Sequence, residues 1–339
     1  LVLKTCTVDM LMKQAKIQHG IYLIICMNVC FGFRLFDLKD VKFTKLPEKD
    51  FCKNTSIITI VHSAPSHQER RKQIRETWGN TRNNKVAFLL GDSLDPYTET
   101  DIEKEHQKYE DIIQGSFVDT YKNLSYKHLL GYKWTHSHCQ DIQYILKTDD
   151  DVFVDVFQLP KLLTEFGFDE IVEKHPFFMC HINDGATPRK FGKWLVTKEE
   201  YPYSYYPVFC SGGAYVTNLL LIESIVQMNY KKFFWVDDVF LTGILPNLSP
   251  VKIKYYQWNN YFLLNHAPYI NDVLETGFNT PELMVIYDVP FSKQGFLFEK
   301  SKKMQQQIKL IEEEFKNHRE TYLPRELKLK DKNLRRYEL

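Results

Sequence analysis

Short apolar runs alternate with longer polar stretches from Ser56 onward. Each short run has the length and β-branched content of a buried strand, and the charged stretches between the runs have helical spacing. Strands alternating with helices predict a mostly parallel sheet with helices on both faces, which is an α/β fold. The predicted strands are 57–61, 86–90, 112–117 and 143–148, and the predicted helices are 67–78, 98–110 and 121–137.

The second half of the chain is less regular. Two adjacent glycines within Cys210–Tyr215 favour a tight turn after an aromatic loop at 201–207. The chain has no internal repeat and no glycine-rich phosphate loop, so a Rossmann dinucleotide fingerprint is absent. The remaining predicted elements are helices at 156–166, 217–228 and 302–315 and strands at 177–180 and 194–197, followed by a basic tail.

The first part of the chain predicts membrane attachment. Residues 1–20 are polar and include lysines, and the charge-free run 21–33 follows them. This run is shorter than the roughly 20 apolar residues of a spanning helix, which leaves a buried core helix as the alternative. Lysines before the run favour a signal-anchor at 21–36 with a cytoplasmic tail and a lumenal remainder. The polar residues 37–54 then predict a stem.

Composition narrows the class of function. The chain has 44 Lys and Arg against 43 Asp and Glu, a formal net charge of +1, so no basic excess predicts binding to nucleic acid. None of the seven cysteines forms a Cys-x-x-Cys pair, which argues against a zinc site. Four scattered cysteines could form two disulfides in any of three pairings, and the sequence triplets starting at Asn54, Asn123 and Asn247 match glycosylation acceptors. The four cysteines are Cys52, Cys139, Cys180 and Cys210.

Three consecutive carboxylates end the predicted strand 143–148. In open α/β sheets the ligand crevice lies beyond the carboxyl ends of the strands, so Asp149, Asp150 and Asp151 are placed where a metal or a phosphate-bearing ligand binds. Adjacent carboxylates repel one another, and a divalent cation relieves that repulsion. The alternative is a solvated acidic turn.

A second acid pair, Asp237 and Asp238, lies in an apolar frame between Val236 and Val239. An apolar setting raises the pKa of a carboxyl and would suit a general base that works near neutral pH. The alternative is a pair of helix N-cap residues, because Asp is favoured at that position.

From Ser56 to His266 the chain resembles the β1,3-glycosyltransferase family of Golgi galactosyltransferases and N-acetylglucosaminyltransferases. The resemblance rests on an ordered set of segments, of which Arg71–Gly79 is similar to Arg-x-x-Ile-Arg-x-Thr-Trp-Gly in that family. Asp237 stands where the family often has Glu. The Gly243–Leu245 stretch lacks a cysteine that many members have, and Cys210–Gly212 is closer to the galactosyltransferase branch. The other similar segments are Phe88–Gly91, Phe117–Lys127, Trp134, Cys139, Lys147–Phe153, Lys193–Trp194, Tyr201–Pro202, Cys210–Tyr215 and Asp237–Val239.

The resemblance implies a GT-A-like fold in a single domain, a UDP-sugar donor and Mn²⁺. Asp151 corresponds to the direct metal ligand, while Asp149 and Asp150 would orient the ribose or bind the metal through water. His266 is the candidate for a third protein ligand, with an ordinary surface histidine as the alternative. A hard cation held by carboxylates neutralises the charge that builds on the leaving diphosphate.

The remaining site residues are implied in the same way. Asp238 matches the base that takes a proton from the acceptor hydroxyl, and Asp237 would support it or bind the acceptor. Five further residues are candidates for binding. The alternative for the two arginines is a salt bridge or a solvated position, and the alternative for the three aromatic residues is packing in the core. Arg71 and Arg75 would bind the donor, and Trp194, Tyr201 and Tyr215 would bind the acceptor sugar.

The expected protein is therefore an inverting, Mn²⁺-dependent β1,3-hexosyltransferase. It would move galactose or N-acetylglucosamine from a UDP-sugar to a glycoprotein or glycolipid glycan, as a single-pass type II protein of the Golgi membrane. The alternatives are a catalytically inactive lumenal glycan-binding protein and a metal-dependent phosphohydrolase. The expected organisation is a tail (1–20), a signal-anchor (21–36), a stem (37–54), a catalytic domain (55–295) and a charged C-terminal helix and tail (296–339).

Overall fold

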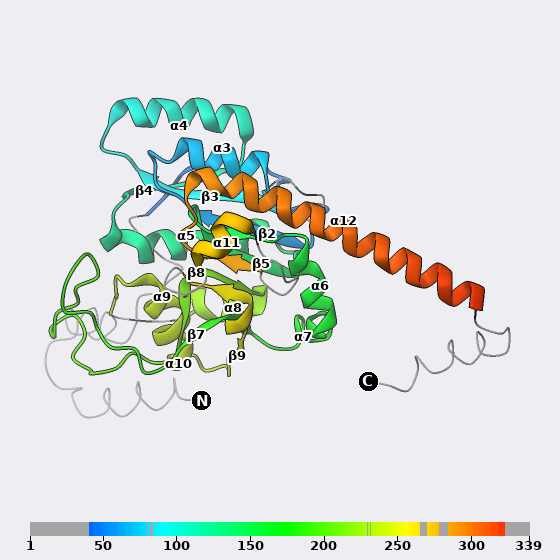
Figure 1. The fold of residues 1–339 in the computed structure, drawn as a ribbon. Helices are drawn as coiled ribbons and strands as arrows, with labels where there is room; N and C mark the ends of the chain where they lie inside the picture. Colours follow the sequence, from blue (N-terminus) through cyan, green and yellow to red (C-terminus); the bar gives the residue numbers. More distant parts are fainter. Residues whose placement is uncertain are drawn as a thin grey trace, which may run out of the picture.

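The computed structural model describes residues 41–322 except 80, 82–83, 229, 231, 265–269 and 278–283 (Figure 1). Within that part of the chain no helix combines the length and apolar character needed to cross a membrane. The predicted cytoplasmic tail and signal-anchor lie outside the described residues, as does 323–339.

An eight-stranded sheet forms the centre of the fold, in the order β1-β4-β3-β2-β5-β8-β7-β9. Strands β4, β3, β2 and β5 are parallel, as the alternating pattern predicts. Strand β8 runs antiparallel to both β5 and β7, so the sheet is mixed, which corrects the prediction of a mostly parallel one. The strands are β1 (Phe43–Lys45), β2 (Ile57–His62), β3 (Asn84–Asp92), β4 (Ile112–Val118), β5 (Tyr144–Asp149), β7 (Phe177–Asn183), β8 (Phe209–Thr217) and β9 (Lys254–Gln257).

Two apolar clusters cover the two faces of this sheet. On β2, Ile58 and Ile60 join one cluster while Ile57 and Val61 join the other, because side chains alternate along a strand. Helices α5, α8 and α9 contribute to the first cluster, and α3, α4, α6 and α12 to the second. The helices include α3 (Gln68–Glu76), α4 (Pro96–Tyr109), α5 (Leu124–His138), α6 (Gln158–Glu165), α7 (Phe168–Ile171), α8 (Leu219–Val226), α9 (Asp237–Val239), α10 (Leu245–Leu248) and α11 (Ile270–Thr276).

A second, three-stranded sheet lies next to the predicted acidic motif. It has the order β10-β11-β6, formed by β10 (Phe262–Leu263), β11 (Val285–Ile286) and β6 (Phe153–Val154). Strand β11 runs antiparallel to β6, and the Val289 N–H donates to the carbonyl oxygen of Asp151 at 2.7 Å. This pairing brings a segment from late in the sequence against the three carboxylates.

Two disulfides select one of the three possible cysteine pairings. Cys52 pairs with Cys139 at the end of α5, and Cys180 on β7 pairs with Cys210 on β8. Residues 41–54, which the sequence assigns to a stem, contribute strand β1 and buried side chains to the same sheet and core. The described part of that segment therefore packs on the domain.

Helix α12 (Phe291–Tyr322) begins earlier than the predicted helix at 302–315. Leu297 and Ser301 are fully buried near its start, and the Ser301 hydroxyl donates to Asp155 Oδ2 at 2.6 Å. The later part of the helix extends away from the body (Figure 1). The expected strand at 194–197 is reduced to one bridge between Arg189 and Leu195.

Candidate active site

Strand β5 places Asp149, the first acid of the triplet, at its carboxyl end, as the sequence predicts. Lys147 and Asp149 lie two residues apart and share one face of the strand, and Lys147 Nζ lies 2.6 Å from Asp149 Oδ1. His62 on β2 and Tyr215 on β8 are the register partners of Asp149 and Lys147. All four side chains therefore belong to the face that α5 covers.

Asp150 is a buried hydrogen-bonding centre. Its Oδ2 accepts from the Ser63 hydroxyl at 2.7 Å and lies 2.7 Å from His67 Nδ1, and its Oδ1 accepts from Arg70 Nη1 at 3.0 Å. Burial raises the pKa of Asp150, but the His67 and Ser63 contacts and the Arg70 charge outweigh it and lower the pKa overall. Both carboxylate oxygens accept hydrogen bonds inside the protein, which gives Asp150 a structural role, and the ribose contact stays a prediction.

Asp151 is the more accessible carboxylate, with 38% of its side-chain surface exposed. Partial burial raises its pKa, and the nearby charges of Asp150 and Asp288 raise it further. Arg70 Nη1 lies 3.5 Å from Asp151 Oδ2 and opposes that shift. Mutual repulsion among exposed carboxylates is what a hard divalent cation relieves. Asp151 therefore fits the predicted metal ligand.

Lys147 lies among the carboxylates of both acidic motifs. Its side chain is buried, and its ammonium donates to the Gly212 carbonyl oxygen and to Asp149. Burial lowers the pKa of Lys147, but the charges of Asp149, Asp237 and Asp238 outweigh it, so the ammonium stays charged. Partial burial raises the pKa of Asp149 to about 7, and Lys147 opposes the rise.

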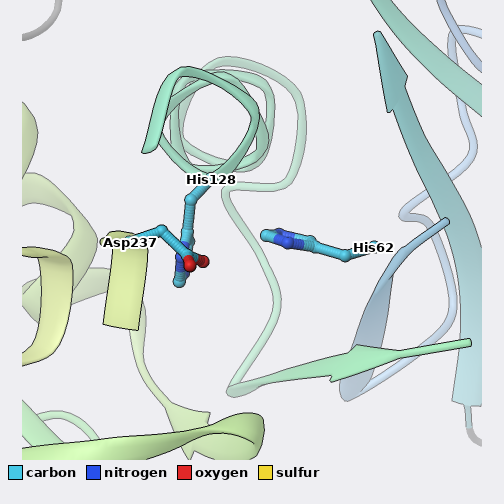
Figure 2. A group of neighbouring side chains, drawn as sticks. All are labelled: His62, His128 and Asp237. Carbon is cyan, nitrogen blue, oxygen red and sulfur yellow. The ribbon is translucent and has the colours of Figure 1, made fainter. Parts of the chain in front are cut away.

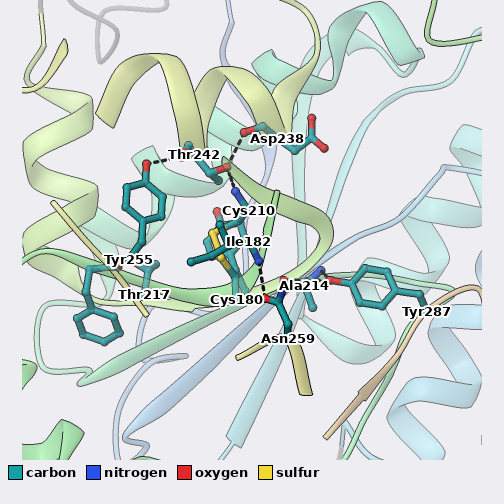
Figure 3. The surroundings of a disulfide bond; sticks show 12 residues. Cys180, Ile182, Cys210, Ala214, Thr217, Asp238, Thr242, Tyr255, Asn259 and Tyr287 are labelled. Carbon is teal, nitrogen blue, oxygen red and sulfur yellow. Dashed lines mark hydrogen bonds between the residues drawn. A yellow bond between two sulfur atoms is a disulfide. The ribbon is translucent and has the colours of Figure 1, made fainter. Parts of the chain in front are cut away.

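Helix α9 positions the second acid pair. Both carboxylates lie in its first turn, where the helix dipole favours negative charge, and Val236 rather than either Asp is the N-cap residue. The backbone of Asp238 is fixed by a relay in which the Cys210 N–H donates to Thr242 Oγ1 at 2.9 Å and that hydroxyl donates to the Asp238 carbonyl at 2.6 Å (Figure 3). The π-helical turn η3 (Phe240–Ile244) follows directly.

Asp238 has the pKa of a base that works near neutral pH. Burial raises it to about 7, the charge of Asp237 adds to the rise, and Lys147 opposes it. Asp237 itself is held as a carboxylate, because the His128 contact outweighs the effect of burial on its pKa. The two neighbouring acids therefore have opposite protonation preferences, which is the pattern of an acid–base site.

The glycine pair lies within strand β8 rather than in the predicted turn. A Cβ on Gly213 would lie 2.0 Å from the ring of Tyr287, and one on Gly212 would lie 3.2 Å from Asp238. Tyr287 also accepts from the Ala214 N–H at 3.2 Å through its hydroxyl (Figure 3). The glycines permit close approach of protein side chains to the strand. From the sequence alone, two adjacent glycines fit either such a strand or a tight turn.

Asp237 also forms a buried group with His62 and His128 (Figure 2). One ligand-type atom from each lies within 4.8 Å of the others, a spacing compatible with a metal ion. Both nitrogens of His128 are already engaged, however: Nδ1 lies 2.9 Å from Asp237 Oδ2, and Nε2 contacts the Tyr215 hydroxyl. The Lys147 charge also disfavours a cation here, since it lowers the pKa of both histidines. A metal in this group is therefore disfavoured.

Arg71 and Arg75 make contacts within the protein, whereas the sequence predicts that they bind the sugar donor. Arg71 is fully buried and uses all of its N–H groups, on Glu105, Ser63 and two backbone carbonyls. Arg75 forms two hydrogen bonds to Asp111 and lies against two aromatic rings. Their guanidinium groups hold α3 to α4, to the loop after β2 and to Asp111 before β4, which gives both arginines a structural role.

The aromatic candidates are also packing residues in large part. Tyr215 is completely buried, and Tyr201 is buried with its hydroxyl donating to the Tyr205 carbonyl at 3.0 Å. Core packing therefore replaces the predicted sugar contact for Tyr215 and Tyr201. Trp194 is half-buried and stacks on Trp235 with ring centroids 5.8 Å apart, and its ring remains a candidate for sugar stacking.

His266 lies outside the described residues. The structure adds residues that the sequence pattern does not single out. They have no motif of their own, because they come from different elements and meet only in the folded chain. These added residues are Ser63, His67, Arg70, His128, Tyr287 and Asp288.

Comparison with known proteins identifies the family of this chain. The galactosyltransferase family model matches residues 69–258. Beta-1,3-galactosyltransferase 5 of Homo sapiens is 31% identical over 250 residues, which covers 68% of this chain and 79% of that protein. Beta-1,3-galactosyltransferase 2 of Homo sapiens is 35% identical over 235 residues, covering 65% of this chain and 53% of that protein.

A third relative is named for the transfer of N-acetylglucosamine. Lactosylceramide 1,3-N-acetyl-beta-D-glucosaminyltransferase of Xenopus tropicalis is 32% identical over 226 residues, covering 61% of this chain and 59% of that protein. A solved galactosyltransferase with donor and acceptor sugar analogs covers 73% of this chain and 94% of its own, at 12% identity and a TM-score of 0.34, too low to assign the fold. The sequence matches make the chain a glycosyltransferase. It belongs to the β1,3-glycosyltransferase family that the galactosyltransferase model describes.

Proposed function

We propose that this β1,3-glycosyltransferase moves a hexose, galactose or N-acetylglucosamine, from a UDP-sugar to a glycoprotein or glycolipid glycan with inversion, using Asp238 as the base in a GT-A-like domain. The observation that carries the proposal is the setting of Asp238. Its carboxylate lies beside Asp237 in the first turn of α9, and burial followed by that neighbour raises its pKa to about 7. A base with this pKa takes a proton efficiently near neutral pH.

The proposed step is a single displacement at the anomeric carbon of the donor. Asp238 accepts the proton of the acceptor hydroxyl, and the hydroxyl oxygen forms the new bond to that carbon. The bond from the carbon to the diphosphate oxygen breaks at the same time, and UDP leaves with its electron pair. Asp237 stays ionised through its contact with His128 and keeps Asp238 basic until the proton arrives.

The donor side of the proposal rests on Asp151. Asp151 and Asp149 are oxygen ligands of the type that Mn²⁺ accepts, and the charges of Asp150 and Asp288 near Asp151 favour a bound cation. When bound, the ion would neutralise charge on the leaving diphosphate. Arg70, which contacts both Asp150 and Asp151, would orient the acidic motif. His266 stays a proposed third ligand.

A lumenal location in the Golgi membrane completes the proposal. The two disulfides of the described domain support it, because disulfides persist in the oxidising secretory pathway and are rare in the cytosol. The predicted signal-anchor at 21–36 would attach the protein to the membrane as a single-pass type II protein.

The test compares Asp238→Asn and Asp151→Asn with Asp101→Asn, an exposed acid on α4 whose partner is Lys104. Purified variants are incubated with Mn²⁺, UDP-galactose or UDP-N-acetylglucosamine and a panel of glycan acceptors, and glycan product and UDP are both quantified. Asp238→Asn should lower transfer by a factor of about 100 or more with UDP affinity retained, because the proton acceptor is lost. Asp151→Asn should lose metal-dependent UDP binding, and Asp101→Asn should match the wild type.

Each other outcome has a definite meaning. Undiminished transfer by Asp238→Asn would remove that residue from the role of base. Metal-dependent UDP binding that survives in Asp151→Asn would place the metal on other ligands. Glycan binding by the wild type without transfer from any donor would favour an inactive lumenal glycan-binding protein. Phosphate release from simple phosphate esters would favour a phosphohydrolase.

A further inference from the structure

We propose that His128 is a positioning residue for transfer, which holds Asp237 as a carboxylate beside the base Asp238 through a one-directional chain of hydrogen bonds from Tyr132 and Tyr215. The inference rests on the proposed role of Asp238. It assigns a function to a buried histidine of α5 that lies away from both acidic motifs in the sequence.

The first step in the argument is the contact between His128 and Asp237. The His128 side chain is 2% exposed, and its Nδ1 lies 2.9 Å from Asp237 Oδ2. A buried carboxylate without a partner takes up a proton, whereas one that accepts a hydrogen bond stays ionised. Since Asp237 is ionised, Nδ1 of His128 carries the hydrogen and donates it.

The second step fixes the other nitrogen. Burial lowers the pKa of His128 and outweighs the opposing effect of Asp237, so the ring is neutral and Nε2 is an acceptor. The Tyr215 hydroxyl contacts Nε2 and must donate its only hydrogen there. The Tyr132 hydroxyl, 2.6 Å from the Tyr215 oxygen, therefore donates to Tyr215. Every hydrogen in the chain points toward Asp237, which locks one tautomer of the histidine.

The third step concerns His62, whose ring meets the His128 ring edge to face at 4.9 Å (Figure 2). Its Nε2 is buried and has no hydrogen-bond partner among the described residues. Burial, then the charge of Lys147, keeps the pKa of His62 well below its ordinary value, and the charge of Lys127 acts in the same direction. His62 is therefore uncharged. It packs against the His128 ring and does not compete with Asp237 for the hydrogen of His128.

Titratable groups from several elements act on the acid pair and enter the expected pH dependence. Lys147 on β5 stabilises both carboxylates, and Asp149 at the end of β5 opposes ionisation of Asp238. Tyr206 and Tyr287 also feel the charge of Asp238. None of these groups donates a hydrogen bond to Asp237 among the bonds found in the described chain, whereas His128 does. The other charged group near this site is Lys127, which acts on His62.

The test uses His128→Ala, which removes the donor, and His128→Asn, whose amide nitrogen takes the place of Nδ1 and keeps it. Transfer kinetics are measured from pH 5 to pH 9 in the full chain with Mn²⁺ and the best donor. In His128→Ala, Asp237 should take up a proton and stop raising the pKa of Asp238. We expect kcat to fall by about tenfold and the acidic limb of the pH profile to move down by about one unit, since a weaker base ionises earlier.

The KM for the donor should stay within about twofold, because Asp151 and the diphosphate side are unchanged. His128→Asn should restore most of kcat and the position of the acidic limb. Thr135→Val is the matched control, because it removes a buried hydroxyl of the same helix that donates to the Gly131 carbonyl oxygen and lies outside the chain to Asp237. It should behave as the wild type. If His128→Ala does not fold, His128→Gln replaces it, since glutamine places its amide nearer to Nε2 than to Nδ1.

The outcomes separate this inference from the proposed function. A donor-less variant whose pH profile coincides with that of the wild type would overturn the role of His128, even with Asp238→Asn inactive. Equal losses in His128→Asn and in the variant without a hydrogen-bond donor would also overturn the role. Such a loss would come from a structural defect and would not depend on the hydrogen bond to Asp237. Activity in Asp238→Asn would instead overturn the assignment of the base.

Discussion

At the scale of single residues, a buried ion pair stabilises the packing of α3 against α4. The Arg71 and Glu105 side chains are 0% and 1% exposed, and their nitrogen and oxygen atoms lie 2.7 Å apart. A buried ion pair adds little compared with apolar residues, but removal of one partner leaves an uncompensated charge. The arginine motif that resembles a donor-binding segment in the sequence therefore acts in the structure by holding α3, α4 and the loop after β2 together.

Arg71→Met should lower the free energy of unfolding by about 3 kcal/mol, the low end for a broken buried pair, because Arg75 still contacts Glu105. Urea unfolding at pH 7 measures this loss. Lys104→Met, in an exposed pair with Asp101, is the control and should leave the unfolding midpoint unchanged. An unchanged midpoint in Arg71→Met would contradict the structural role.

The effect of Arg71→Met should also depend on pH. Burial raises the pKa of Glu105, but its contacts with Arg71 and Arg75 outweigh burial and lower the folded-state pKa below the unfolded value. The pair therefore stabilises the fold above the unfolded pKa, and this contribution is lost as the pH falls through the folded pKa. The difference between wild type and variant should shrink in acid.

At the scale of elements, strand β8 links the site to the core. It pairs with β5 and β7, carries the glycines beside Asp238 and Tyr287, and anchors Thr242 through Cys210. A tight turn is the natural interpretation of two glycines in the sequence. The strand forms instead because both neighbouring strands satisfy its backbone groups and because Gly213 leaves room for an aromatic ring.

Gly213→Ala should destabilise the protein by about 1–3 kcal/mol, as overpacking does, because its Cβ would lie 2.0 Å from the Tyr287 ring. Thermal and urea unfolding measure the loss. The double variant Gly213→Ala with Tyr287→Ala removes the clash and is the matched test. If adding Gly213→Ala to Tyr287→Ala costs as much as it does in the wild type, the clash is not the cause.

At the scale of the whole molecule, two disulfides tie distant parts of the chain to one sheet. Cys52 and Cys139 are separated by 87 residues, and Cys180 and Cys210 by 30. The first joins the segment before β2 to the end of α5, which carries His128, and the second joins β7 to β8. Closing a longer loop restricts the unfolded chain more.

Replacing Cys52 and Cys139 together by Ala should therefore cost about 1 kcal/mol more stability than replacing Cys180 and Cys210, by the dependence of loop entropy on length. All four side chains are buried, so the cavity terms are similar. Denaturant unfolding of the two double variants, each against the oxidised wild type, measures the difference. A larger loss for the shorter loop would show that local packing, rather than loop length, dominates.

The sequence by itself determined the α/β alternation, the strand that ends at Asp149 and the two acidic motifs, because these depend on local periodicity and on side chains close together along the chain. The ordered motifs also indicated the family correctly. Tertiary structure decided which groups meet. Arg71, Tyr201 and Tyr215 are buried by elements far away in the sequence, and Asp150 is enclosed by the loop after β2.

The setting of the proposed base, Asp238, shows the same division most clearly. The pair Asp237 and Asp238 is visible in the sequence, but burial and the charge of Asp237 raise the pKa of Asp238, whereas His128 on α5 lowers the pKa of Asp237. Electrostatic effects depend on distance through space and on desolvation, and neither follows from distance along the chain. The sequence therefore supplied the carboxylates, and the packing of α5 and α9 against the sheet decided their chemistry.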